Sequence, residues 1–133
     1  MRLVHEAAAG DDRRTVASRV ELADSPFARA RGFVGRRPPE GLALVMRFRR
    51  QARRRLHMFG VPVALEAAWV CDGVVQRVAR LRPWLGLTTG VADTVVECRA
   101  GALADVAPGD RLRVVDAGRT DTHDPGSGAA PGD

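Results

Sequence analysis

A run of arginines, RRQARRR, occupies residues 49–55, and the apolar, histidine-containing segment LHMFGVPV follows at 56–63. Guanidinium groups at this density can bind phosphates or carboxylates, because each carries a permanent charge and several N–H donors. The apolar stretches on either side, 42–48 and 56–63, predict two strands that pair as a long hairpin. Its exposed tip, Arg47 to Arg55, would be polar with or without a ligand. The candidate ligand-binding residues are Arg49, Arg50, Arg53, Arg54, Arg55 and His57 and, further along the chain, Glu66.

Three further residues could together perform acid–base or nucleophilic chemistry. His57 and Glu66 lie on predicted strands that could be adjacent, and a histidine oriented by a carboxylate can act as a general base. Cys71 is the plausible nucleophile, since no serine or threonine lies in a G-x-S-x-G turn. A hydrolase-like enzyme using His57 with Glu66 or Cys71 is therefore one hypothesis, and a histidine held in the fold is the ordinary alternative. We assign no catalytic residue, and the pattern favours a protein that is not an enzyme.

Metal and cofactor motifs are not recognisable. The histidines at 5, 57 and 123 have no spacing that would bring two of them together. Cys71 and Cys98 have no partner cysteine at C-x-x-C spacing, so we expect two free thiols that pack as small apolar side chains. The glycines do not form a phosphate-binding loop. We therefore expect no metal and no cofactor.

The charge balance allows an anionic partner. The chain has 133 residues and a net charge of +5, and all 21 of its basic residues are arginine. An excess of arginine over lysine is also what GC-rich codon usage produces, so composition alone gives only a weak indication of an anionic partner. No apolar run approaches the roughly 20 residues of a membrane span, and the first ten residues do not resemble a signal peptide. We expect a cytoplasmic protein without a membrane partner, and the oligomeric state is left open.

Short extended segments separated by turn residues predict a mainly β protein. The clearest is the hairpin at 65–81, because Asp72 and Gly73 suit a type I′ turn. Residues 15–23 predict one strand, and residues 82–93 a loop anchored by Trp84. Ser25 and Pro26 predict the start of a short helix, and a helical turn is expected after residue 100.

These elements amount to about seven short strands with one or two short helices. The predicted fold class is mainly β, or β-rich α+β, as a compact sandwich or barrel. We expect one globular domain over residues 1–116. Residues 117–133 have no apolar residue larger than alanine, which predicts a disordered tail.

Several segments together resemble the family named domain of unknown function 192. They are ELADSPFARARGFVGRRP, LVMRF, HMFGVPVALEAAWVCDGVV, RLRPW and ADTVVECRAGALADVAPGDRLRV, and they cover residues 15–115. The resemblance implies a compact β-rich fold and no established reaction. His57 departs from the family pattern, which often has Trp there, and Phe59, Gly60 and Val61 replace a polar Lys-Asn-Thr. The positions that match family motifs, and for which we expect structural roles, are Arg29, Gly32, Met58, Glu97, Gly101, Gly109 and Asp110.

Three functions are compatible with these observations. The sequence favours a small non-catalytic β domain that binds a ligand or partner not yet identified. A polyanion or nucleic-acid binder that uses the tip Arg47 to Arg55 is the first alternative. The hydrolase-like enzyme is the second.

Overall fold

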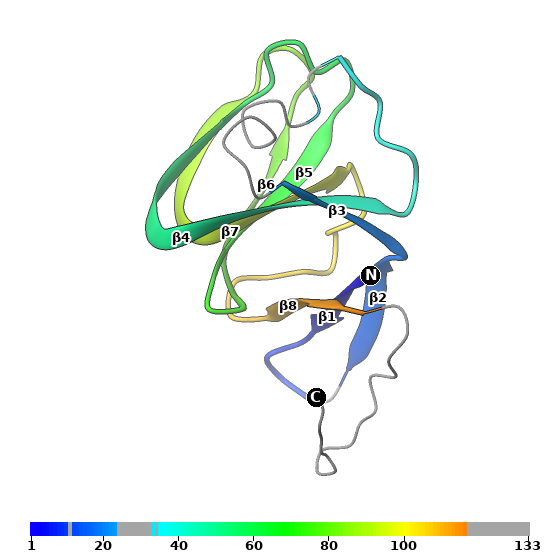
Figure 1. Ribbon diagram of the computed structural model, residues 1–133, viewed down its shortest axis with the longest axis vertical. Coiled ribbons are helices and arrows are strands. Elements are labelled where there is room, and N and C mark those ends of the chain that lie inside the picture. The colour runs from blue at the N-terminus through cyan, green and yellow to red at the C-terminus, as the bar shows by residue number, and fades with distance from the viewer. Residues whose placement is uncertain (11, 24–32, 34, 117–133) are drawn as a thin grey trace.

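The computed structural model describes residues 1–10, 12–23, 33 and 35–116. All regular structure in this part of the chain is β, which confirms the predicted mainly β class (Figure 1). The helix expected from Ser25 and the tail at 117–133 lie outside the described residues, and the helical turn expected after residue 100 is a series of turns. None of the described elements is a helix long and apolar enough to cross a membrane. The strands are β1 (Arg2–Glu6), β2 (Arg13–Ala17), β3 (Arg19–Ala23), β4 (Leu42–His57), β5 (Leu65–Cys71), β6 (Val74–Leu81), β7 (Leu87–Arg99) and β8 (Arg111–Val115).

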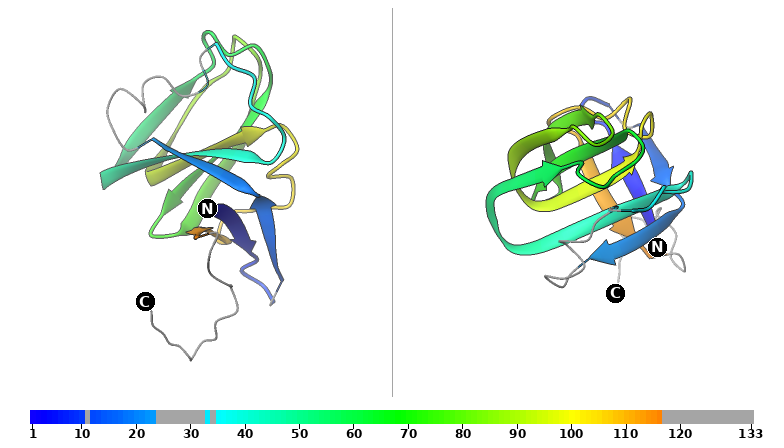
Figure 2. Two further views of the ribbon diagram at one scale, coloured as in Figure 1. Left: turned by 45° about the vertical axis from the view of Figure 1, so that its right-hand side comes forward. Right: turned by 90° about the horizontal axis from the view of Figure 1, so that it is seen from above.

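The strands form one sheet in the order β2-β1-β8-β6-β5-β7-β4-β3. Every neighbouring pair is antiparallel except β3 and β4. The edge strands β2 and β3 are consecutive in the chain and only Ser18 separates them, so the sheet must bend strongly for the chain to reach both edges (Figure 2). Residues 15–23, predicted as one strand, are therefore parts of two. The layout is a single eight-stranded sheet that does not close into a barrel.

The central strands are covered on both faces. Successive residues of a strand point to opposite faces, and β5 is buried from Leu65 to Val70. Leu65 and Trp69 belong to one apolar cluster, together with Met58, whereas Val70 belongs to a second cluster, together with Leu3. Burial of each large apolar side chain contributes roughly 1.5–3 kcal/mol. The bent sheet thus encloses one core and presents its other face to a second core beneath β1 and β8.

The arginine run does not form a hairpin tip, so this prediction was wrong. It lies inside β4, a single strand of 16 residues that pairs with β7 from Ala43 opposite Cys98 to His57 opposite Leu87. The register shifts between Arg47 and Ala52, which indicates a bulge at this point. The far part of the pair, residues 52–57 of β4 with residues 87–92 of β7, is called the ribbon below.

Trp69 explains why the ribbon folds back over the sheet. Its Nε1–H donates a hydrogen bond of 3.0 Å to the Arg54 carbonyl oxygen. Gly90 packs so closely on the indole that a Cβ there would lie 2.7 Å from Trp69 Cγ. Residues 87–93 are therefore strand and not the predicted loop, and Trp84, expected to anchor that loop, is 55% exposed.

The β5–β6 hairpin was predicted correctly. Cys71 pairs with Val74, and the two residues between them, Asp72 and Gly73, have φ angles of 50° and 80°. Two consecutive positive φ angles define the type I′ turn, whose twist matches that of the flanking strands. This hairpin supplies β5, the strand on which both cores are assembled.

Candidate binding surface on the β4–β7 ribbon

The ribbon has one inner and one outer face. Leu56 is buried in the first core, so Arg53, Arg55 and His57 lie on the opposite, outer side of β4 and are exposed. Residues directly opposite each other share a face, so the outer face includes Val91 beside Arg53 and Leu87 beside His57. The outer face therefore combines Arg53 and Arg55 of β4 with Val91 and Leu87 of β7, and Thr89, opposite Arg55, lies between these two apolar residues.

Arg54 differs from its neighbours because it points inward. Its Nε–H donates to the Ala92 carbonyl at 3.3 Å and its Nη2 to the Arg50 carbonyl at 2.6 Å. The guanidinium carbon lies 3.9 Å from the centre of the Phe48 ring, a cation–π contact. Arg54 therefore holds the bulge of β4 in place, and we do not count it among the residues of the binding surface.

The other arginines of the run are exposed and carry uncompensated charge. Arg49, Arg50, Arg53 and Arg55 form no ion pair with any residue that the structure describes. Elsewhere, by contrast, Arg14 pairs with Asp105, Arg36 with Glu21 and Arg113 with Glu6. The sequence placed these four arginines at the surface correctly, although their setting is a strand and not a loop.

Charge is unevenly distributed along the chain. Segments 47–65 and 73–92, which include the ribbon and the loops at its end, contain nine arginines and no acidic residue. The remaining 12 arginines share the rest of the chain with all 16 acidic residues. The positive net charge of the protein therefore originates in these two segments. An excess of positive charge attracts anions over a distance of about 10 Å at moderate salt.

Large apolar side chains are exposed at the end of the ribbon. Phe59 is 76%, Leu85 71%, Leu87 65% and Trp84 55% exposed. They lie in or beside two neighbouring loops, residues 58–64 and 82–86, which are seen at the top of Figure 1. Sequence reasoning missed this cluster, although large apolar residues among the turn formers of RPWLGL were a usable signal.

Hydrogen bonds fix the two loops to each other. The Met58 N–H donates to the Gly86 carbonyl at 2.8 Å, and the Trp84 N–H donates to the Val61 carbonyl at 3.1 Å. Met58, one of the family-motif residues, is buried and packs so tightly on Gly86 that a Cβ there would lie 2.7 Å from Met58 Cγ. The backbones of the two loops are therefore held in position relative to each other.

The three residues of the hydrolase hypothesis have different environments in the structure. His57 is exposed and lies opposite Leu87. Glu66 is buried and its Oε1 accepts a hydrogen bond of 2.7 Å from the Leu103 N–H, whereas the Cys71 Sγ lies 3.6 Å from the Val91 carbonyl oxygen, to which it donates. Among the described residues, no hydrogen bond or ion pair joins His57 to either. Glu66 thus holds the turns that precede β8, and the described residues contain no group of three His, Cys, Asp or Glu side chains able to hold a metal ion.

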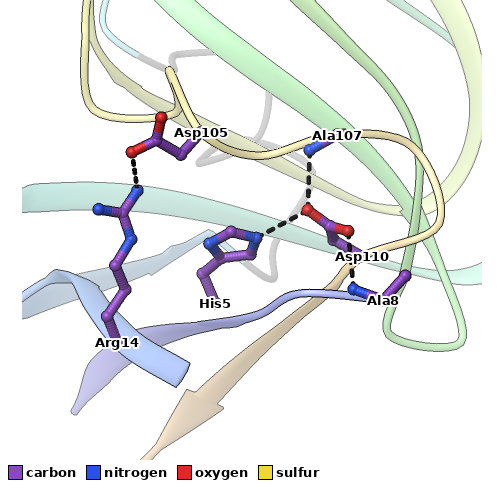
Figure 3. A network of polar contacts seen from close by, with 6 residues as sticks. All are labelled: His5, Ala8, Arg14, Asp105, Ala107 and Asp110. Carbon is purple, nitrogen blue, oxygen red and sulfur yellow. Dashed lines mark hydrogen bonds and ion pairs between the residues drawn. The ribbon is translucent and has the colours of Figure 1, made fainter. Parts of the chain in front are cut away.

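A buried polar network connects β1 to the turn before β8 (Figure 3). Asp110 Oδ2 lies 2.8 Å from His5 Nε2 and accepts the Ala107 N–H at 3.0 Å, while Oδ1 accepts the Ala8 N–H at 2.9 Å. The backbone hydrogen bonds, with that of His5, lower the pKa of Asp110 to about 2. A structural role was predicted for Asp110, but the role of His5, which is 105 residues away in sequence, was missed.

Glu97 is the second buried acidic residue with an unusual environment. It is 6% exposed and lies in register with Leu44 on β4 and Ala67 on β5, both of the first core. Burial raises the pKa of Glu97 to about 7, and the charge of Arg36 opposes this increase. Within the described part of the chain, no hydrogen bond to its carboxyl group is formed.

The remaining family-motif positions are turn glycines or lie outside the described part. Gly101 and Gly109 have φ angles of +98° and +95°, which residues with a Cβ rarely adopt. Their expected structural role therefore has a conformational reason. Arg29 and Gly32 lie outside the described residues.

A comparison with known protein families identifies the family of this chain. The model of the family DUF192, described as Uncharacterized ACR, matches residues 7–114. The chain belongs to the DUF192 family. The resemblance proposed from short motifs is thereby confirmed and extended to nearly all of the described chain. No curated protein matches this DUF192 chain.

Two solved structures share the fold of this DUF192 protein. One, from Sinorhizobium meliloti 1021, is provisionally described as a transcription regulator; it is 23% identical, with 84% of this chain and 92% of that chain covered and a TM-score of 0.72. The other, a protein of unknown function from Novosphingobium aromaticivorans DSM 12444, is 19% identical, with 86% and 84% covered and a TM-score of 0.73. At these identities the similarity concerns the fold alone.

Proposed function

We propose that this DUF192 protein is a non-catalytic binding domain that recognises an anionic macromolecule through the exposed arginines of β4. One observation carries the proposal. Four arginines, at positions 49, 50, 53 and 55, are exposed without an ion pair to any described residue, in segments without acidic side chains. A surface of this kind is electrostatically costly unless an anion compensates it.

Other features favour binding over catalysis. His57, Glu66 and Cys71 have separate partners or none within the described residues, so the geometry offers no general base beside a nucleophile. The buried His5–Asp110 pair is enclosed, with His5 only 6% exposed, and is used to connect two strands. The two cysteines are free thiols, which agrees with the reducing cytoplasm that we propose as the location.

The first test is a salt titration with generic polyanions. Binding of a fluorescent 20-nucleotide oligothymidine is measured by anisotropy between about 50 and 200 mM NaCl, and retention on heparin is measured in parallel. Four neutralised phosphates on a single strand give a log–log slope of about −3, equivalent to a loss of affinity of roughly 50-fold over this range.

A matched pair of variants localises the effect. The variant R49Q/R50Q/R53Q/R55Q should lose binding, whereas R19Q/R37Q/R99Q/R111Q, which changes four exposed arginines outside the two basic segments by the same total charge, should retain most of it. Equal losses in both variants would mean that only net charge matters. Equal losses, or no binding to either polyanion at low salt, would refute the proposal.

A further inference from the structure

We propose that the anionic partner is the surface of a lipid bilayer rich in anionic headgroups, and that the apolar loop residues Phe59, Trp84 and Leu85 enter its interfacial layer. This inference rests on the proposed function and specifies the partner. It does not require a spanning segment, because a surface-bound protein inserts side chains only to the depth of the headgroups and upper acyl chains. The sequence-based expectation of no membrane partner concerned a spanning segment, and the proposed surface binding replaces that expectation.

The exposed side chains are of the types that enter an interface. Leu85 and Phe59 are more than 70% exposed, and Trp84, which combines a large apolar ring with an N–H donor, is 55% exposed. Tryptophan is enriched where membranes meet water for this reason. Exposing three such side chains to water in two adjacent loops is unfavourable, so their presence indicates a partner that buries them.

The composition of the cluster favours lipid over nucleic acid. A single-stranded nucleic acid would use aromatic rings and arginines, but it would gain little from leucine, which does not stack on bases. Leu85 and Leu87 are the second and third most exposed large apolar side chains of the described chain, after Phe59. Aliphatic side chains are instead stabilised in the acyl region of a bilayer, with arginines contacting the phosphates above it.

The position of the charges fits the same orientation. Arg82 is the first residue of the loop that bears Trp84 and Leu85, and Arg55 lies on β4 two residues before His57, where the ribbon ends. Both arginines are exposed, and neither has an ion pair among the described residues. With the loop tips in the interface, these guanidinium groups would lie at the level of the headgroup phosphates. Each arginine near an anionic surface strengthens partitioning by about fivefold, equivalent to about 1 kcal/mol.

The backbones of the two loops are also ordered before any partner binds. The hydrogen bonds from the Met58 N–H to the Gly86 carbonyl and from the Trp84 N–H to the Val61 carbonyl fix their backbones. Trp84 itself has a φ of 62°, an uncommon conformation for a residue with a Cβ, and its ring is nevertheless left largely in solvent. Because the loops are already ordered, little conformational entropy is lost when a partner binds them.

The fluorescence emission of the tryptophans can be used to measure vesicle binding. Trp69 is completely buried, whereas Trp84 is exposed, so a change of emission on binding reports the environment of Trp84. The full chain is mixed with vesicles of phosphatidylcholine containing about 30% phosphatidylglycerol, and with vesicles of phosphatidylcholine alone. We expect a blue shift and sedimentation with the anionic vesicles only, and no blue shift for Trp84→Phe.

The variant Phe59→Ser/Leu85→Ser tests insertion. Both side chains are exposed, so the fold should be retained, which the urea midpoint checks. We expect at least a tenfold loss of vesicle binding with unchanged binding to oligothymidine. The variant R49Q/R50Q/R53Q/R55Q should lose both activities, and R19Q/R37Q/R99Q/R111Q should keep both.

The outcomes separate this inference from the proposed function. Binding to oligothymidine or heparin without binding to anionic vesicles would overturn the lipid assignment and leave the proposed function standing. If Phe59→Ser/Leu85→Ser leaves vesicle binding unaffected and Trp84 emission does not change, the protein adsorbs by charge alone. This result would overturn the insertion of the loop residues. Failure to bind any of these probes would refute both.

Discussion

The stability of this protein should depend on pH through the carboxyl group of Glu97. Its environment raises the pKa of Glu97 from 4.5 to about 7 because the side chain is buried between apolar residues of β4 and β5. In the unfolded chain the same group ionises near its ordinary pKa. Between these two values the folded state therefore binds more protons than the unfolded state, and stability decreases as pH rises.

The size of the effect follows from the shift. A pKa difference of about 2.5 units corresponds to about 3 kcal/mol over the whole titration, most of which falls between pH 5 and pH 8. Glu97→Gln replaces the carboxyl group with a neutral group of the same shape. Between pH 5 and pH 8, the free energy of unfolding of this variant should decrease by about 2–3 kcal/mol less than that of the parent protein. This corresponds to a difference of roughly 10 °C between the Tm shifts of the two proteins.

Urea unfolding followed by the emission of Trp69, in the Trp84→Phe background, measures this difference at each pH. Other titrating groups are present in both proteins and cancel in the comparison. The buried thiol of Cys98 does not interfere, because burial raises its pKa to about 12. Parallel pH profiles for the two proteins would show that the pKa of Glu97 is not raised in the folded state, and the reasoning about its environment would be wrong.

Two further predictions concern the contacts that hold the sheet. Asp110→Ala removes the acceptor for the buried His5 ring and for two partly buried backbone N–H groups. The free energy of unfolding, measured with urea at pH 7, should fall by about 1–3 kcal/mol. A decrease below about 0.5 kcal/mol would contradict the proposed role of this network. Gly90→Ala places a Cβ 2.7 Å from Trp69 Cγ and should lower stability by about 1–3 kcal/mol with altered Trp69 emission, whereas an unchanged Tm would show that the ribbon does not pack tightly on the indole.

Local sequence was sufficient for the fold class and for one hairpin. β-Branched and apolar runs between turn residues predicted strands, because extended backbone and tight turns have strong local preferences. Asp72 and Gly73 specified the β5–β6 turn, since few residues tolerate two consecutive positive φ angles. The order of short motifs also predicted the family, which a match over residues 7–114 confirmed.

The ribbon could not be predicted locally. A polar run between two apolar strands ordinarily marks a turn, and the arginines of β4 form part of a strand only because β7 pairs with them and Trp69 supports the inner face. Whether residues 49–55 turn back or continue depends on a partner strand more than 30 residues later in the chain. Non-local pairing of this kind leaves no signature within a short window.

The sequence by itself determined the chemical inventory of this protein: a β-forming chain, an arginine-rich segment without acidic neighbours, and turns fixed by Asp and Gly. Only the tertiary structure decided which side chains meet water and which meet each other. It placed His5 against Asp110, buried Glu97 between two apolar strands, and left Phe59, Trp84 and Leu85 exposed on two loops that backbone hydrogen bonds join. The physical reason is that burial is a property of the whole chain, because the atoms that exclude water from a side chain come from segments far away in sequence.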